Sequence, residues 1–108
     1  MNQENLVNRT SPPQRVRQLV SAITREVHDR LGAQARIIWF GSWVTGKARA
    51  NSDIGIAIDA PGGIAMAEYA SLWNWVDDLP TLYTIDLVNL SEVSEPFRQE
   101  ILKQGIAL

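Results

Sequence analysis

The sequence predicts a small α/β (α+β) domain in which helices pack on a mixed sheet of about three to four strands. Two segments, 12–31 and 64–79, carry apolar residues at helical spacing. Three others, 35–40, 53–59 and 82–90, are short, rich in β-branched or aromatic residues and bounded by glycine or proline. With a last helix after residue 94, the elements alternate along the chain, and this alternation is typical of helices that cover a sheet.

The first helix is expected over residues 12–31. Ser11 and Gln14 form a capping-box pattern, and Pro12 suits the first helical position. One face is apolar, and Gly32 is a natural stop. The apolar face consists of Val16, Leu19, Val20, Ile23, Val27 and Leu31.

Two strands are expected to follow. The run 35–40 is continuously apolar and ends at Gly41, which is typical of a strand buried on both faces. In 53–59 the isoleucines alternate with smaller or acidic residues, so that one face is apolar and the other carries Asp53, Gly55 and Asp59.

The second half of the chain adds a helix over 64–79, closed by Pro80, and a third strand over 82–90. In that strand Asp86 shares a face with Thr84 and Val88, while the opposite face carries Tyr83, Ile85, Leu87 and Asn89. A last helix is expected to begin near Ser94, with Pro96 in its first turn, and to end at Gly105.

Length and composition limit the classes of protein. The 108 residues fit one domain, expected over 11–108, after a polar and flexible lead-in over 1–10. A net charge of −2 argues against a nucleic-acid binder, and the absence of cysteine excludes a thiol nucleophile and cysteine-based zinc sites. Without a signal-peptide pattern or an apolar run of roughly 20 residues, the protein is expected in the cytoplasm, away from membranes.

The stretch GSWVTGKARANSDIG, residues 41–55, carries the parts of a phosphate and metal site. Gly41 and Ser42 form a tight turn where the backbone can approach a phosphate, and a basic segment follows with Gly46, Lys47 and Arg49. Asp53 then opens a strand, and Asp86 comes alongside it if the second and third strands are neighbours. Two carboxylates at that separation suit one Mg²⁺ ion.

This stretch resembles the signature of the minimal nucleotidyltransferases of the DNA polymerase β-like superfamily. In that signature Gly-Ser is followed by ten residues, an Asp, any residue and a second Asp. Here Gly41-Ser42, ten residues and Asp53 match, Ser42 and Gly46 match an SxxxG element, and Asp86 matches a third carboxylate in a later strand. The resemblance covers most of residues 12–108.

The resemblance implies a nucleotidyltransferase fold and transfer of a nucleoside monophosphate, such as AMP from ATP, to a protein or small acceptor. It implies Mg²⁺ and a nucleoside triphosphate, with Asp53 and Asp86 as catalytic metal ligands. The turn and basic segment would bind the nucleotide. Many small members resemble the MntA-type antitoxin of a two-gene pair, which implies a HEPN-domain partner and a homo- or hetero-oligomer.

The sequence departs from the signature at two positions. Gly55 replaces the second motif aspartate, and Trp43 stands where the family often has a basic or small residue. Asp59 lies six residues beyond Asp53, roughly 20 Å along a strand, and cannot substitute. The sequence therefore predicts Mg²⁺-nucleotide binding with slow or absent transfer, which Gly55→Asp should raise. The alternative is a degenerate, antitoxin-like module that binds a HEPN-domain partner without chemistry.

Structural roles remain open for each of these residues. Asp53 can simply begin a strand, and Ser42 can be a cap without a ligand. Asp86 can be exposed on an edge strand or can form a salt bridge. Lys47 and Arg49 can belong to a solvated loop. Among four tryptophans, Trp73 and Trp75 point in different directions from one helix, and one of them can mark a partner surface.

Overall fold

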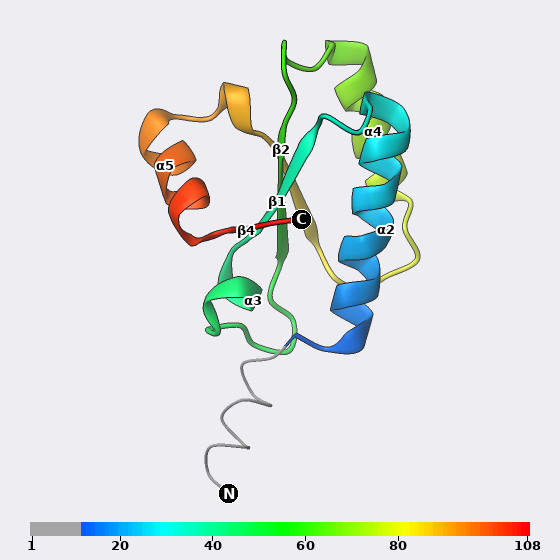
Figure 1. Ribbon diagram of the computed structural model, residues 1–108. Coiled ribbons are helices and arrows are strands. Elements are labelled where there is room, and N and C mark those ends of the chain that lie inside the picture. Colours follow the sequence, from blue (N-terminus) through cyan, green and yellow to red (C-terminus); the bar gives the residue numbers. More distant parts are fainter. Residues whose placement is uncertain (1–11) are drawn as a thin grey trace, which may run out of the picture.

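A four-stranded mixed sheet forms the centre of the computed structural model, which describes residues 12–108 (Figure 1). In spatial order the strands are β3 (Ile85–Asn89), β2 (Ile54–Asp59), β1 (Arg36–Phe40) and β4 (Ile106–Ala107). Strand β1 pairs antiparallel with β2 and β4, whereas β2 and β3 are parallel. This arrangement confirms the predicted mixed sheet and its strand number.

Helices cover both faces of the sheet. Helices α2 (Gln14–Leu31) and α4 (Met66–Asp77) lie on one side, and α5 (Glu95–Gln104) lies on the other (Figure 1). The four-residue helix α3 (Ser42–Thr45) follows β1, and a 3-10 turn, η1 (Leu90–Glu92), follows β3. Within residues 12–108, no helix combines the length and the apolar character that crossing a membrane requires.

Each face of the sheet has its own hydrophobic core. The core beneath α2 and α4 is the larger and includes Ile23, Ile37, Ile56 and Leu72. The core beneath α5 consists of Ile38, Ala57, Val88, Leu90 and Ile101, with Phe40, Val93 and Phe97 packed against it. Strands β1 and β2 are therefore buried on both faces, as their continuous apolar sequences predict.

Several element boundaries differ from the predictions. Helix α2 begins at Gln14, and Pro13 is its N-cap without a side-chain hydrogen bond, so the expected start at Pro12 was wrong. Ser11 and the predicted lead-in lie outside the described residues. The third strand spans only Ile85–Asn89, because the chain at 81–84 turns at the end of the sheet, where Leu82 is fully exposed.

The last helix follows its local signals. The Ser94 side chain accepts a hydrogen bond from the Phe97 N–H, Pro96 lies in the first turn, and Gly105 is the C-cap. After Gly105 the chain returns along β1 as β4, with Ile106 opposite Trp39. No local sequence signal predicts this two-residue strand, because its stability comes from pairing with β1 rather than from local propensity.

Candidate functional site at one end of the sheet

Four of the predicted site residues gather at one end of the sheet. Gly41 and Ser42 follow β1, Asp53 precedes β2, and Asp86 is the second residue of β3. Because β1 runs antiparallel to β2 and β3, its carboxyl end meets their amino ends, and Phe40 lies opposite Gly55. The topology thus places the turn and both aspartates at the same edge.

Both aspartates belong to the sheet face covered farther along by α5. Asp86 shares the face of Val88, and Asp53 shares the face of Gly55 and Ala57, because side chains alternate along a strand. The parallel register pairs Gly55 with Asp86. Asp53 lies two residues before Gly55 on the same face, so the two carboxylates project from adjacent strands on one side of the sheet.

The two carboxylates interact electrostatically. The pKa of Asp86 is raised above its usual value, first by partial burial of its carboxyl group and second by the negative charge of Asp53. Asp86 as a whole residue is exposed and β3 is an edge strand of the sheet, so the burial is incomplete and the placement also fits the alternative of an exposed aspartate on an edge strand. Within residues 12–108 the ion pairs join Arg30 with Glu26 and Arg36 with Asp59, so the salt bridge considered for Asp86 is not formed.

The Gly41-Ser42 turn faces open space. Gly41 has φ of 98°, a left-handed conformation that favours glycine, and a Cβ there would meet no heavy atom within 4 Å. The N–H groups of Val44 and Thr45 donate to the Gly41 carbonyl. In the described part of the chain, no hydrogen bond engages the N–H groups of Ser42 and Trp43. Two backbone donors and the Ser42 hydroxyl are thus free to meet an anionic ligand.

Trp43 holds the site together, a role that its sequence position did not suggest. Its side chain is buried, and its indole N–H donates to the Ser52 carbonyl at 3.0 Å, one residue before Asp53. Its ring also meets the ring of Tyr83 edge to face, with centroids 6.2 Å apart. Trp43 therefore fixes α3 against the segments that lead into β2 and β3. The unusual tryptophan after Gly-Ser was the available signal, but its partners depend on tertiary packing.

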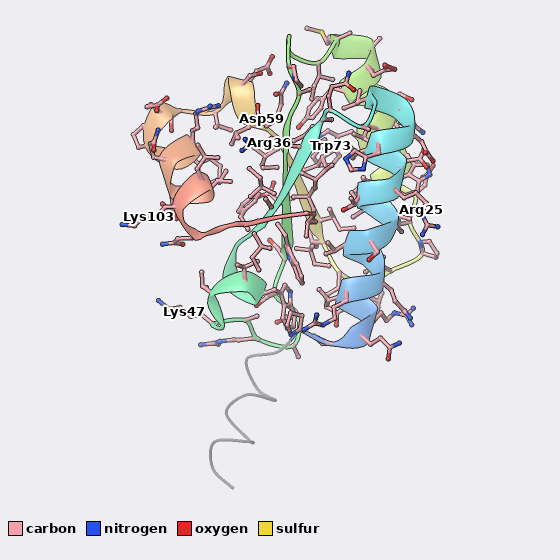
Figure 2. The ribbon with its side chains drawn as sticks, in the orientation of Figure 1. Arg25, Arg36, Lys47, Asp59, Trp73 and Lys103 are labelled. Atoms are coloured by element: carbon pink, nitrogen blue, oxygen red, sulfur yellow. The ribbon has the colours of Figure 1, made fainter. Side chains whose placement is uncertain are left out.

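Within residues 12–108, the side chains of the basic segment form no ion pair with Asp53 or Asp86. Gly46 ends α3 in a left-handed conformation with φ of 80°. Lys47 is exposed, and its side chain extends away from the sheet (Figure 2). Arg49 is exposed in a turn closed by a hydrogen bond from its N–H to the Ser52 hydroxyl at 2.7 Å. For Lys47 this placement fits the alternative of a solvated loop.

Asp59 lies at the opposite end of β2, as its spacing required. It faces Arg36 across the β1–β2 pair and forms an ion pair with it at 3.6 Å, far from Lys47 (Figure 2). Within residues 12–108, no group of three or more His, Cys, Asp or Glu side chains is arranged to hold a metal ion. Asp53 and Asp86 are the two carboxylates at this end of the sheet, and two carboxylates could hold a Mg²⁺ ion only if phosphates and water completed its coordination.

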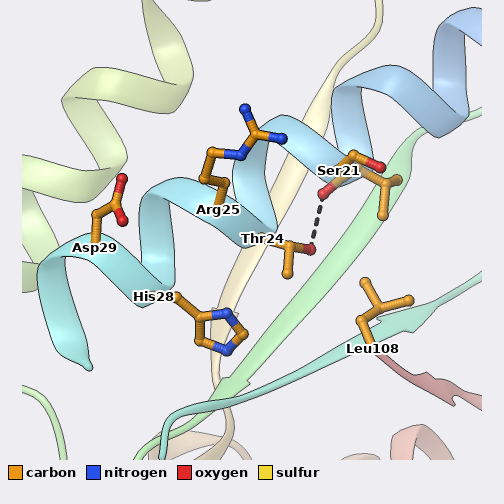
Figure 3. Close-up of a pocket in the computed structure, with 7 residues that line it drawn as sticks. Ser21, Thr24, Arg25, His28, Asp29 and Leu108 are labelled. Carbon is orange, nitrogen blue, oxygen red and sulfur yellow. Dashed lines mark hydrogen bonds between the residues drawn. The ribbon is translucent and has the colours of Figure 1, made fainter. Parts of the chain in front are cut away.

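Another part of the surface contains a cavity of about 400 Å³ between α2 and the end of β4 (Figure 3). Its lining includes Arg25, His28 and Leu108, and none of the predicted site residues. The imidazole Nε2 of His28 lies 3.0 Å from the Ala35 carbonyl oxygen, a structural contact between α2 and the residue before β1. The cavity is therefore separate from the aspartates.

Comparison with known proteins agrees with the fold. Residues 26–108 match the family model for polymerase beta, nucleotidyltransferase. A structure described as a minimal nucleotidyltransferase shares the fold, with 23% identity and a TM-score of 0.66 over 88% of this chain and 94% of that chain. A search of curated proteins found no significant match.

Two toxin–antitoxin structures are also similar. One, described as MntA-HpeT, carries two aspartate-to-glutamate changes at positions two apart; identity is 26% and the TM-score 0.64, over 81% of this chain and 69% of that chain. The other contains AMP-PNP, with 25% identity and a TM-score of 0.61 over 80% of this chain and 69% of that chain. The family match over most of the chain, on a fold that brings Gly41-Ser42, Asp53 and Asp86 to one edge, shows that this protein belongs to the polymerase β-like nucleotidyltransferase family.

Proposed function

We propose that this protein binds a nucleoside triphosphate with one Mg²⁺ ion at the edge formed by the Gly41-Ser42 turn, Asp53 and Asp86. The proposed reaction is transfer of a nucleoside monophosphate, AMP from ATP, to a protein or small acceptor. Transfer is slowed by Gly55 at the position of the second carboxylate. The observation that carries the proposal is the placement of Asp53 and Asp86 on one face of the adjacent parallel strands β2 and β3, at the end of the sheet where the Gly41-Ser42 turn follows β1.

Within residues 12–108 neither carboxylate forms an ion pair, and two nearby carboxylates without a basic partner favour a bound cation. Each carboxylate repels the other when both are ionised, and a divalent ion between them removes that repulsion. When bound, Mg²⁺ neutralises phosphate charge and polarises the phosphoryl group. The backbone N–H groups of Ser42 and Trp43, with the Ser42 hydroxyl, are placed to orient phosphate oxygens.

The partner is proposed to be a HEPN-domain protein. Support comes from the similarity to two toxin–antitoxin structures, one of which contains AMP-PNP. The second candidate function is partner binding without transfer, and Gly55 is the specific observation that favours it. Of the two helix tryptophans, Trp73 is 38% exposed and Trp75 is half-buried, so a partner surface on α4 would include Trp73.

A labelling experiment separates these functions. The chain is incubated with labelled ATP, Mg²⁺ and the product of the adjacent gene, beside an Asp53→Asn variant and a Glu100→Gln control, an exposed residue of α5. Label on the partner that disappears in Asp53→Asn and persists in Glu100→Gln supports transfer. A stable unlabelled complex supports the binding module. If Mg²⁺-ATP leaves the melting temperature of the wild-type chain unchanged, the nucleotide-binding proposal is wrong.

A further inference from the structure

The β4 edge of the sheet presents backbone groups that face no neighbouring strand. β4 is the last strand in the order β3-β2-β1-β4, and within residues 12–108 no strand pairs with its outer side (Figure 1). The Leu108 N–H donates to the Ile37 carbonyl at 2.9 Å, and Ala107 is opposite Ile38. Because hydrogen-bonded and non-hydrogen-bonded pairs alternate in an antiparallel ladder, the N–H and C=O of Ala107 point away from β1.

The side chains along this edge are apolar and exposed. Ile106 is 48% exposed and Leu108 is 46% exposed. Both lie on the α2 face of the sheet, because they are opposite Trp39 and Ile37 of the larger core. Ala107 lies between them on the α5 face. Leu108 also lines the cavity of about 400 Å³ beside α2 (Figure 3), so the edge combines apolar side chains with a hollow next to them.

The two edges of the sheet differ in their protection against pairing. Free edges in natural proteins are commonly blocked by a charged side chain, a proline or a bulge. The β3 edge carries the exposed Asp86, whereas residues 106–108 include no charged side chain and no proline. An exposed apolar edge of this kind is a template for pairing with another strand. The shortness of β4 limits such pairing to few residues.

The β4 edge is complementary to itself. If two copies meet antiparallel with Ala107 opposite Ala107, each Ala107 N–H can donate to the Ala107 carbonyl of the other copy. In that register Ile106 of each copy is opposite Leu108 of the other, on the α2 face. Four exposed apolar side chains would then cover one another beside the two cavities. A two-fold axis repeats each contact, as an isologous dimer interface requires.

We propose that β4 pairs antiparallel with β4 of a second copy of this chain, so that two four-stranded sheets join into one across a two-fold axis. Two hydrogen bonds and one apolar cluster make a small interface, so the dimer is weak and depends on protein concentration. Asp86 lies on β3, the opposite edge of the sheet, so pairing at β4 leaves the candidate site open. The inference therefore does not depend on the proposed function.

Sedimentation of the full chain over a concentration series tests the association, with wild type, Ala107→Pro and Leu82→Ser. Proline lacks the N–H that points outward, and an edge strand tolerates proline at such a position. We expect a monomer–dimer equilibrium in wild type and a dissociation constant about tenfold or more higher in Ala107→Pro, because two hydrogen bonds are lost. Leu82→Ser, which changes a fully exposed apolar residue before β3, should associate like wild type.

Cysteine crosslinking tests the register. The sequence has no cysteine, so Ala107→Cys introduces a single thiol. Opposite residues of a hydrogen-bonded antiparallel pair have Cα atoms about 5.5 Å apart, which a disulfide can span. Under mild oxidation, Ala107→Cys should form a disulfide-linked dimer much faster than Ala67→Cys, an exposed position on α4 that measures random collision.

Three results would overturn the proposal. One is a wild-type chain that remains monomeric at its highest soluble concentration, and another is equal crosslinking of Ala107→Cys and Ala67→Cys. The third is an Ala107→Pro chain that is folded by circular dichroism and dimerises like wild type. If Ala107→Pro does not fold, the crosslinking rates decide. A monomeric wild type whose Ala107→Pro variant loses binding to the product of the adjacent gene would show that the edge pairs with that protein instead.

Discussion

At the scale of single residues, Asp86 is the clearest sign of a site. It is the exposed residue of β3, whose other residues are buried, and both partial burial of its carboxyl group and the charge of Asp53 raise its pKa. A raised pKa means that folding disfavours the ionised form relative to the unfolded chain. A residue that lowers stability at neutral pH, in a cluster with a second carboxylate, is typical of a functional site.

Asp86→Asn should therefore stabilise the fold at neutral pH. The pKa of Asp86 in the folded chain lies above its usual value of 3.8. The stability difference between wild type and variant is therefore smallest below pH 3.8, and wild type loses stability relative to the variant as the pH rises from there through the folded pKa of Asp86. Urea unfolding between about pH 3 and pH 7 measures this difference. Asp77→Asn, on exposed α4, controls for the loss of one negative charge.

Mg²⁺ provides a second measurement on the same pair. If the ion binds between Asp53 and Asp86, it should raise the melting temperature of wild type more than that of Asp86→Asn. An Asp86→Asn chain that is less stable than wild type at pH 7 would show that the carboxylate has a structural role instead.

At the scale of elements, the short helix α3 links the two aspartate-bearing strands through Trp43. Its indole reaches Ser52 before β2 and Tyr83 before β3. The geometry of the site thus depends on the buried Trp43 side chain, which contacts both the segment before β2 and the segment before β3. This explains how a four-residue helix is stably placed, because isolated helices of that length do not form.

Trp43→Phe should lower both the stability of the fold and the affinity for Mg²⁺-nucleotide, although it replaces one aromatic ring with another. Phenylalanine keeps an aromatic ring beside Tyr83 but removes the hydrogen bond to Ser52, which we expect to cost about 0.5–1.5 kcal/mol of unfolding free energy. Because Ser52 precedes Asp53, affinity for Mg²⁺-nucleotide should fall as well, which calorimetric titration measures.

The matched control is Trp73→Phe, which removes the hydrogen bond of 3.2 Å from another indole to the Tyr69 hydroxyl on α4, away from the aspartates. It should leave nucleotide affinity unchanged. Equal losses of affinity in both variants would contradict a positioning role for Trp43.

At the scale of the whole molecule, the sheet is stabilised from both sides by separate cores. Ile23 of α2 is fully buried on one side, and Ile101 of α5 is 1% exposed on the other. Both cores share β1 and β2, whose alternate residues enter opposite layers. The α5 layer matters for the site because its core ends at Phe40 beside Gly55.

Ile23→Ala and Ile101→Ala should each lower the free energy of unfolding by about 2–5 kcal/mol. Because the two side chains lie in different cores, the double variant should show the sum within about 0.5 kcal/mol, in a single cooperative transition. Urea unfolding followed by tryptophan fluorescence and by circular dichroism tests this. Two separated transitions would show that α5 and its layer unfold independently.

The sequence alone determined the α/β class, the helices and strands with strong periodicity, and the set of residues proposed for the site. Periodicity is local, so apolar faces such as that of α2 could be predicted directly from the sequence. Capping signals are local as well, and Ser94 is the N-cap at which α5 begins. The spacing from Gly41-Ser42 to Asp53 was likewise readable, since it is a linear pattern.

The tertiary structure decided what these residues face. The parallel pairing of β2 with β3 set Gly55 beside Asp86, and the antiparallel pairing with β1 set Phe40 on its other side. Strand register and ring placement arise from long-range packing, which no local pattern encodes. For that reason the missing carboxylate was visible in the sequence, whereas the Phe40 ring that lies against Gly55 was not.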